Sequence, residues 1–140
     1  SLGLLRSLAS VALAAEPGPK DEDATEDFTK TKSGLEYRML RKGKGERPKA
    51  SDTVEVHYKG WLDDEEKTVL DSSYKRDESI EFPLNGVIKG WTEGMQLVQQ
   101  GGMIELKIPA ELGYGKRGVP QAKIPPNATL HFLVELIDIK

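Results

Sequence analysis

The chain has no cysteine and only two histidines among its 140 residues. Without cysteine it can form no disulfide, thiol nucleophile or cysteine-rich metal site. His57 and His131 each lack a second histidine at metal-ligand spacing, which disfavours zinc chemistry and histidine-based hydrolysis. We interpret both histidines as structural or solvent-exposed, and we expect neither a metal nor a cofactor.

A strong charge of one sign is also lacking. The 20 basic and 23 acidic residues are spread along the chain and give a net charge of −3, so nucleic acid is not an expected partner. The apolar run within residues 1–15 is too short to span a bilayer, and no membrane contact is predicted. A chain of this length suits one domain with a single hydrophobic core.

The first fifteen residues, SLGLLRSLASVALAA, differ in composition from everything that follows. Arg6 precedes a short apolar run, and Ala12-Leu13-Ala14 has the small-x-small pattern of a signal-peptidase site. This favours a signal-peptide remnant and an exported or periplasmic protein. The alternative is a loosely helical tail on a cytoplasmic protein.

Residues 16–34 are rich in proline, glycine and acidic side chains and nearly lack aliphatic ones. Such a segment buries too little apolar surface to offset the entropy of ordering it. We therefore predict a disordered acidic linker over 16–34 and a folded domain over 35–140. Residues 1–30 are expected to be mobile and dispensable.

From Leu35 onward, apolar and polar residues alternate with a period of two, as in half-buried β-strands. The pattern occurs over residues 35–40, 54–59, 104–108 and 130–137. The last segment is apolar on both faces, which predicts a central strand.

Only residues 88–98, IKGWTEGMQLV, carry apolar side chains at helical spacing. A helix this short is stable only when its apolar face docks on other structure. We therefore expect an α+β domain in which an antiparallel sheet covers one short helix. Trp91 would begin that helix, and Gly90 and Gly94 would leave free space around its indole. It is either the floor of a pocket or a core residue.

Five motifs then follow in order: VEVHYKGWL (54–62), LDSSYKR (70–76), VIKGWTEGM (87–95), IPAELGYG (108–115) and IPPNATLHFLVELIDI (124–139). Together they resemble the FKBP family of peptidyl-prolyl cis-trans isomerases, from about Thr31 to Lys140. The stretch SGLEYRMLRKGKGERP resembles exported bacterial FKBPs with an N-terminal extension. The resemblance implies a strongly bent antiparallel β-sheet wrapped around one short α-helix, with a shallow apolar pocket between them.

The resemblance also implies roles for particular residues. Trp91 would support the substrate proline ring, Tyr114 would donate its hydroxyl to a substrate carbonyl, and Asp71 would be a largely buried carboxylate held by Arg76 and Tyr58. Asp71, Tyr114, Trp91 and Tyr58 are thus the candidate catalytic residues. The candidate substrate-binding residues are Val87, Ile88, Phe132, Arg76, Leu70, Ile80 and Ile124.

Several residues depart from the family pattern. Leu70 and Ile80 stand where aromatic wall residues are usual, and the turn DDEEKT (63–68) looks longer than its usual counterpart. The loop KRGVPQAK (116–123) lacks a common histidine and carries Lys123 where an aliphatic residue is frequent. These departures bear on turnover and on affinity for macrolides.

By this resemblance, the expected function is rotation about X-Pro peptide bonds, which assists protein folding. The alternative is an FKBP-fold module that binds proline segments or acts as a chaperone with little catalysis. The expected partners are proline-containing polypeptides and macrolides such as tacrolimus or rapamycin. We expect a monomer.

Overall fold

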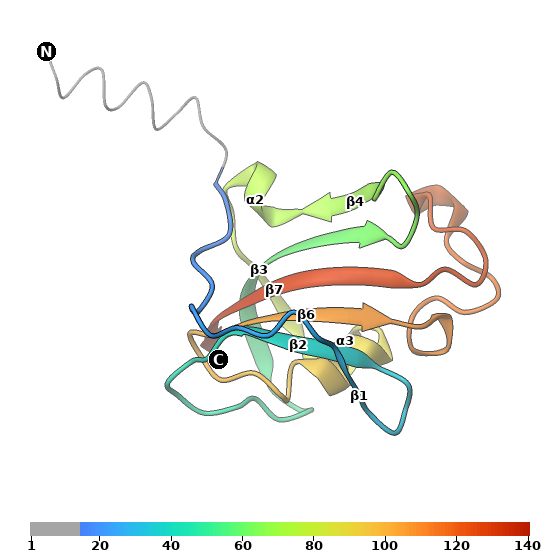
Figure 1. Cartoon of the computed structure of the whole chain (residues 1–140). Helices are drawn as coiled ribbons and strands as arrows, with labels where there is room; N and C mark the ends of the chain where they lie inside the picture. Colours follow the sequence, from blue (N-terminus) through green and yellow to red (C-terminus); the bar gives the residue numbers. More distant parts are fainter. Residues whose placement is uncertain (1–14) are drawn as a thin grey trace, which may run out of the picture.

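The computed structural model describes residues 15–140, and the alternating segments of the sequence form one antiparallel sheet (Figure 1). Its strands are β1 (Thr29–Lys30), β2 (Glu36–Arg41), β3 (Thr53–Leu62), β4 (Val69–Ser72), β5 (Ile80–Pro83), β6 (Met103–Ile108) and β7 (Leu130–Ile139). The strand order is β1-β2-β6-β7-β3-β4, and β5 also pairs with β3. The expectation of a bent antiparallel sheet around a short helix is confirmed. The predicted signal remnant, apart from its last residue, lies outside the described residues.

The two longest strands, β3 and β7, form the centre of the sheet. In β3, Val54, Val56 and Tyr58 are buried while the residues between them are only partly so. Strand β7 pairs with β6 on one side and with β3 on the other, so the predicted central position of the last strand is confirmed. Its buried residues Val134 and Leu136 lie in the same core as those of β3.

Strands β4 and β5 share one edge of β3, and the alternation did not reveal either of them. Strand β4 pairs with the end of β3 and β5 pairs with its beginning. Each has only four residues, too few for a period of two to stand out from chance. The register shifts next to Gly60, and irregularities of this kind bend and twist a strand.

Helix α3 (Lys89–Gly94) lies against the sheet and is shorter than the predicted 88–98 (Figure 1). Beyond it the chain continues in turns, yet Met95 and Val98 are fully buried as the helical spacing required. The remaining helical pieces are α2 (Ser73–Arg76) and the 3-10 turns η1 (Leu84–Gly86), η2 (Ala110–Leu112) and η3 (Pro120–Ala122). No helix within residues 15–140 is long and apolar enough to cross a membrane.

The glycines of α3 have a different role from the one predicted. A Cβ atom on Gly90 would lie 2.6 Å from Ile108, and one on Gly94 would lie 2.6 Å from Leu106. Both contacts face β6, so these glycines allow the helix to approach the sheet closely. The prediction that they clear space around Trp91 is therefore wrong.

The prediction of a disordered linker over residues 16–34 also needs correction. The amide of Asp21 donates to the carbonyl of Leu40 at 2.8 Å, and that of Gly18 donates to Glu135 Oε1 at 3.2 Å. Strand β1 then pairs with β2 at the edge of the sheet. The segment is held by backbone hydrogen bonds to the sheet, which its low apolar content could not indicate.

Candidate active site

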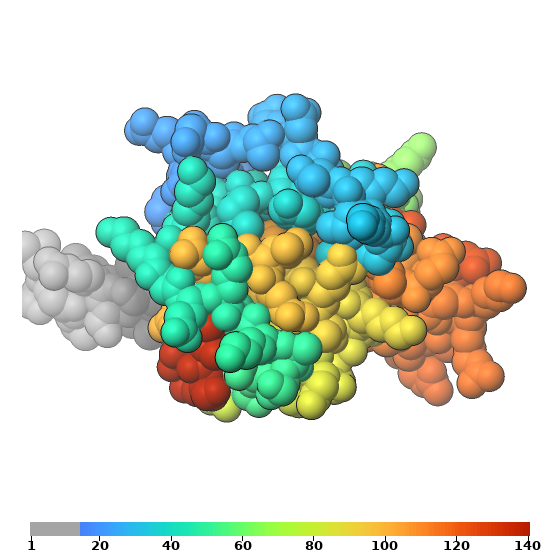
Figure 2. Space-filling view, turned by 90° about the horizontal axis from the view of Figure 1, so that it is seen from below, coloured from blue at the N-terminus to red at the C-terminus, as the bar shows by residue number. Residues whose placement is uncertain are grey.

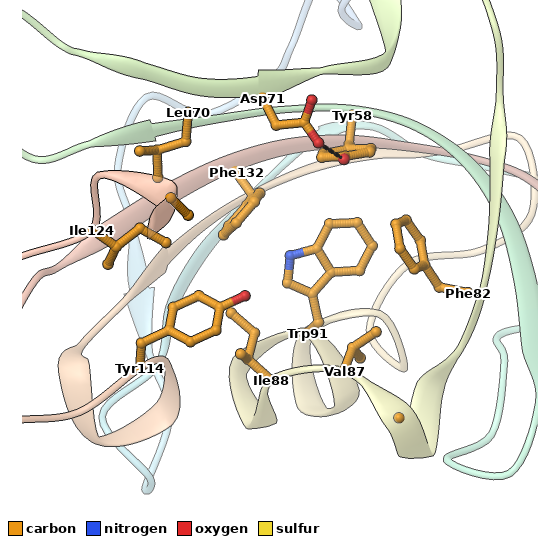
Figure 3. A pocket seen from close by; sticks show the side chains of 12 residues that line it. Tyr58, Leu70, Asp71, Phe82, Val87, Ile88, Trp91, Tyr114, Ile124 and Phe132 are labelled. Atoms are coloured by element: carbon orange, nitrogen blue, oxygen red, sulfur yellow. Dashed lines mark hydrogen bonds between the residues drawn. The ribbon is translucent and has the colours of Figure 1, made fainter. Parts of the chain in front are cut away.

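A mainly apolar pocket of about 640 Å³ opens between the bent sheet and α3 (Figure 3). It is lined by Tyr58, Leu70, Asp71, Phe82, Gly86, Val87, Ile88, Trp91, Tyr114, Ala122, Ile124 and Phe132. Every predicted site residue except Arg76 and Ile80 is in this set. The residues come from segments far apart in the sequence, which the sheet and helix bring together.

Trp91 lies at the base of the pocket, packed by three other aromatic rings. Its ring centroid is 5.5 Å from that of Tyr58 and 5.4 Å from those of Phe82 and Phe132, all in edge-on arrangements. This packing leaves Trp91 only 4% exposed. The two alternatives for Trp91 therefore hold together, because it both lines the pocket and belongs to the core.

Phe82, which the sequence reading missed, takes the wall position that had been given to Ile80. Ile80 pairs with Val56 across β5 and β3 and packs against the core. Phe82 lies two residues further along β5, on the same face, and contacts both Tyr58 and Trp91. The wall therefore keeps an aromatic residue here, and the alternation I-E-F in β5 was the signal that could have located it.

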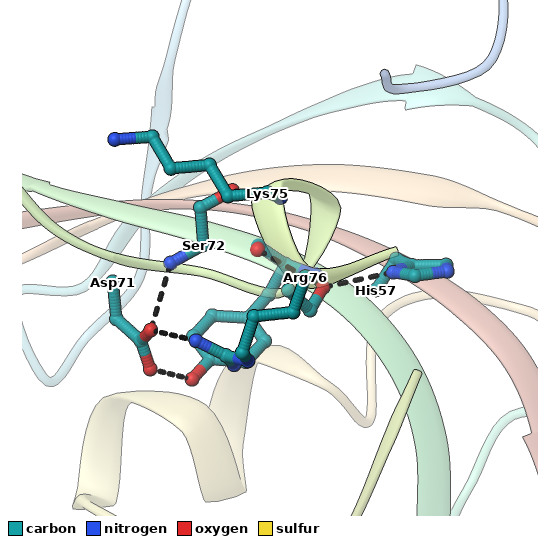
Figure 4. A network of polar contacts seen from close by, with 7 residues as sticks. His57, Asp71, Ser72, Lys75 and Arg76 are labelled. Carbon is teal, nitrogen blue, oxygen red and sulfur yellow. Dashed lines mark hydrogen bonds and ion pairs between the residues drawn. The ribbon is translucent and has the colours of Figure 1, made fainter. Parts of the chain in front are cut away.

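A charged corner lies at one wall of the pocket and centres on Asp71 (Figure 4). Tyr58 donates its hydroxyl to Asp71 Oδ2. Arg76 Nη1 lies 2.6 Å from Asp71 Oδ1, and the amide of Ser72 donates to the same oxygen at 2.8 Å. Arg76 does not line the pocket, so its contribution is to hold the carboxylate.

The contacts of this corner fix its protonation at neutral pH. Partial burial on its own raises the pKa of Asp71, but hydrogen bonds from Tyr58, Arg76 and the Ser72 amide outweigh it and hold the pKa below its ordinary value. Burial and the Asp71 acceptor raise the pKa of Tyr58 to about 12. Asp71 is therefore ionised and Tyr58 is protonated. The Asp71 side chain is 44% exposed, which corrects the prediction of a largely buried carboxylate.

Ser73 is a further residue that the sequence did not single out, because a serine in a polar run reads as part of a turn. It is fully buried, and its hydroxyl accepts from the amide of Tyr58 at 2.7 Å. The same oxygen lies 2.9 Å from Nδ1 of His57. Ser73 thus ties α2 to β3 at the residue that carries the Tyr58 ring. Neither His57 nor His131 lines the pocket.

Tyr114 stands at the opposite side of the pocket, on the loop that follows η2. Its side chain is 40% exposed, and Figure 3 shows its hydroxyl directed inward, toward Ile88. Within residues 15–140 no group of three or more histidine, aspartate or glutamate side chains could hold a metal ion. The pocket thus combines an aromatic floor at Trp91, the ionised carboxylate of Asp71 and the hydroxyl of Tyr114.

Residues 44–137 match the family model described as FKBP-type peptidyl-prolyl cis-trans isomerase. The chain belongs to this FKBP family.

The relatives of this FKBP domain include longer bacterial proteins. It is 50% identical over 133 residues to the FKBP-type peptidyl-prolyl cis-trans isomerase FkpA of Escherichia coli (strain K12), covering 91% of this chain and 48% of the relative. It is also 50% identical over 131 residues to the 22 kDa FKBP-type isomerase of the same organism, covering 91% of this chain and 62% of that protein. The chain therefore spans about half the length of FkpA.

Solved structures agree with the fold. The crystal structure of FkpA from Escherichia coli matches with a TM-score of 0.77 and 51% identity, covering 83% of this chain and 53% of that one. The crystal structure of AtFKBP13 matches with a TM-score of 0.73 and 33% identity, covering 81% and 99%. The arrangement of the sheet and the short helix is thus that of the family.

Proposed function

We propose that this FKBP domain is a peptidyl-prolyl cis-trans isomerase that acts on proline-containing polypeptides and assists their folding. The observation that carries the proposal is the pocket itself, in which the aromatic floor at Trp91 lies between an ionised Asp71 and the hydroxyl of Tyr114. The family match and the names of the similar proteins support the same activity. The reaction requires no cofactor.

The chemistry explains why such a pocket is sufficient. Rotation about a peptide bond breaks amide resonance over a barrier of ~18–20 kcal/mol, and before proline it takes tens to hundreds of seconds. Resonance places negative charge on the carbonyl oxygen, and the twisted transition state carries less of it. An apolar pocket therefore disfavours the planar amide more than the twisted one, and a preference of ~4 kcal/mol gives about a thousandfold acceleration.

We assign the individual roles on the same basis. The proline ring lies on Trp91, between the walls formed by Phe82, Val87, Ile88 and Phe132, and Tyr114 donates its hydroxyl to a carbonyl of the substrate. Asp71 acts through its charge and by orienting the Tyr58 ring. Because Asp71 is ionised and already accepts three hydrogen bonds, we do not assign it a proton transfer.

The rival function is a proline-binding or chaperone module with little catalysis. Leu70 favours it, because it supplies an aliphatic wall where the family usually has an aromatic one. Phe82 weighs against it, because it restores the aromatic contact that Ile80 would have lost. Binding of proline segments is common to both functions, so only the rate of isomerisation separates them.

A protease-coupled isomerisation assay on short proline peptides tests the proposal. We expect the parent protein to accelerate isomerisation. Tyr114→Phe and Asp71→Asn should each lower kcat/KM by about tenfold, the equivalent of one hydrogen bond of about 1.4 kcal/mol. Tyr37→Phe removes a hydroxyl outside the pocket and is the matched control, with unchanged kcat/KM. A parent that binds the peptide without accelerating its isomerisation would establish the rival function instead.

Three further properties belong to the same proposal. The pocket takes macrolides such as tacrolimus or rapamycin, because it offers them the apolar floor at Trp91 and the hydroxyl of Tyr114 that it offers to a proline segment. The protein is a monomer, which sedimentation at micromolar concentration tests. Export is supported by the composition of residues 1–15, and fractionation of cells that produce the full-length protein tests it.

A further inference from the structure

The loop of residues 115–124, here called the flap, closes one side of the pocket in a fixed shape. Val119 and Ile124 exchange two backbone hydrogen bonds, of 2.8 and 3.0 Å. The amide of Gly118 donates to the carbonyl of Tyr114 at 3.1 Å. Gly118 has a φ of +65°, and a Cβ atom there would lie 2.4 Å from the carbonyl oxygen of Ile124. The flap is therefore a defined hairpin, visible in Figure 2 as part of the orange lobe at one end of the molecule.

The flap carries three positive charges and no negative one. Lys116, Arg117 and Lys123 are all exposed, and none of them forms an ion pair within the part of the chain that the structure describes. Lys123 stands directly between two pocket-lining residues, Ala122 and Ile124. A cationic residue without an ion-pair partner in the described structure therefore stands in the chain between two residues of the pocket wall.

The rest of the rim differs in charge from the flap. Asp71 is the only acidic residue that lines the pocket, and Arg76 already neutralises it. Glu65 and Glu66 are exposed in the turn between β3 and β4, which lies at the same end of the molecule as the flap (Figure 1). Neither glutamate lines the pocket, so the lining itself carries no charge that would compete with the positive charges of the flap.

We propose that the flap lysines make this domain selective for proline segments with an aspartate or glutamate next to the proline. The inference rests on the proposed function, because it takes the proline ring to lie on Trp91. Adjacent residues are about 3.8 Å apart along the chain, and Lys123 adjoins two lining residues, so we expect a side chain that flanks the proline to come within reach of Lys123. Exposed ion pairs of this kind change binding by about two- to fivefold, and salt screens them.

The test compares proline peptides that carry glutamate, alanine or lysine immediately before or immediately after the proline. We expect glutamate to exceed lysine in kcat/KM by about fivefold at one flank, with the difference shrinking between about 20 mM and about 300 mM NaCl. Lys123→Glu should reverse the preference at that flank. Lys44→Glu changes the net charge equally at an exposed site outside the pocket lining, so it should leave the preference unchanged.

The outcomes separate this inference from the proposed function. Equal rates for glutamate and lysine peptides at both flanks, or an equal shift in Lys44→Glu and Lys123→Glu, would overturn the selectivity while leaving the isomerase intact. If the parent accelerates none of the peptides, the isomerase proposal fails. The dissociation constants of the same peptides, measured by NMR titration, then decide the selectivity by themselves. Thermal unfolding of each variant verifies that it is folded.

Discussion

Replacing Trp91 by leucine should affect stability and binding together, because this residue is both core and pocket base. The substitution removes three edge-on aromatic pairs, with Tyr58, Phe82 and Phe132. Each such pair contributes about 0.5–1.5 kcal/mol beyond its buried area. We therefore expect Trp91→Leu to lower the free energy of unfolding by about 2–4 kcal/mol, measured by urea denaturation followed by circular dichroism.

The same substitution should weaken proline peptides. Leucine keeps the pocket floor apolar, but the rings of Tyr58, Phe82 and Phe132 lose the partner that fixes them as pocket walls. A loss of ~1.5 kcal/mol, about one edge-on aromatic contact, corresponds to about a tenfold increase in Kd. NMR titration with a proline peptide measures this effect in the fraction of protein that is folded.

Trp61→Leu is the matched control for both measurements. Trp61 is only partly buried, stacks on His131 with centroids 5.4 Å apart, and lies outside the pocket lining. It should cost about 1 kcal/mol of stability and leave the peptide Kd unchanged. Two results would refute the reasoning: an equal stability loss in both variants, or an unchanged peptide Kd in Trp91→Leu.

Three other changes follow from the contacts. Hydrogen bonds lower the pKa of Asp71 in the folded protein. The stability that Asp71 contributes is therefore complete above the unfolded carboxyl pKa of about 4, and it is lost as pH falls through the lower folded pKa. Asp71→Asn should remove this part of the pH dependence of urea denaturation. Gly94→Ala places a Cβ 2.6 Å from Leu106 and should cost about 1–3 kcal/mol, and a thermal melt within 1 °C of the parent would contradict this. Arg41→Ala leaves the mostly buried Glu135 without its 2.6 Å partner and should lower stability by about 1–3 kcal/mol, whereas a change below about 0.5 kcal/mol would show that the pair is solvated.

Much of the fold was open to prediction because its long strands are patterned. The four alternating segments correspond to β2, β3, β6 and β7, and the all-apolar last segment is the central strand. Strands β4 and β5 were not visible, because their pairing with β3 depends on tertiary contacts rather than on a pattern within four residues. The attachment of residues 18–30 to the sheet could not be predicted either, because hydrogen bonds that the backbone forms do not depend on the composition of the segment.

Most of the candidate site residues lie together in one pocket, but the surroundings of these residues were harder to predict. The resemblance to the FKBP family implied that Trp91, Tyr58 and Phe132 line one pocket, and the structure brings them together. The exposure of Asp71 and the role of Ser73 depend on how α2 docks on β3, which no local pattern encodes. A shift of two residues along β5 likewise separates Phe82 from Ile80.

The position of β7 has a consequence for how the molecule folds. Although β7 follows every other strand in the sequence, it lies between β6 and β3, so the two halves of the sheet have no direct pairing until it inserts. This gives the domain many contacts between distant parts of the chain, a topology that folds slowly compared with helical proteins of its size. The insertion also brings Phe132 to Tyr58 and Trp91. Closure of the sheet and assembly of the pocket therefore depend on the same strand, and we expect no form in which β7 is unpaired to hold a proline ring.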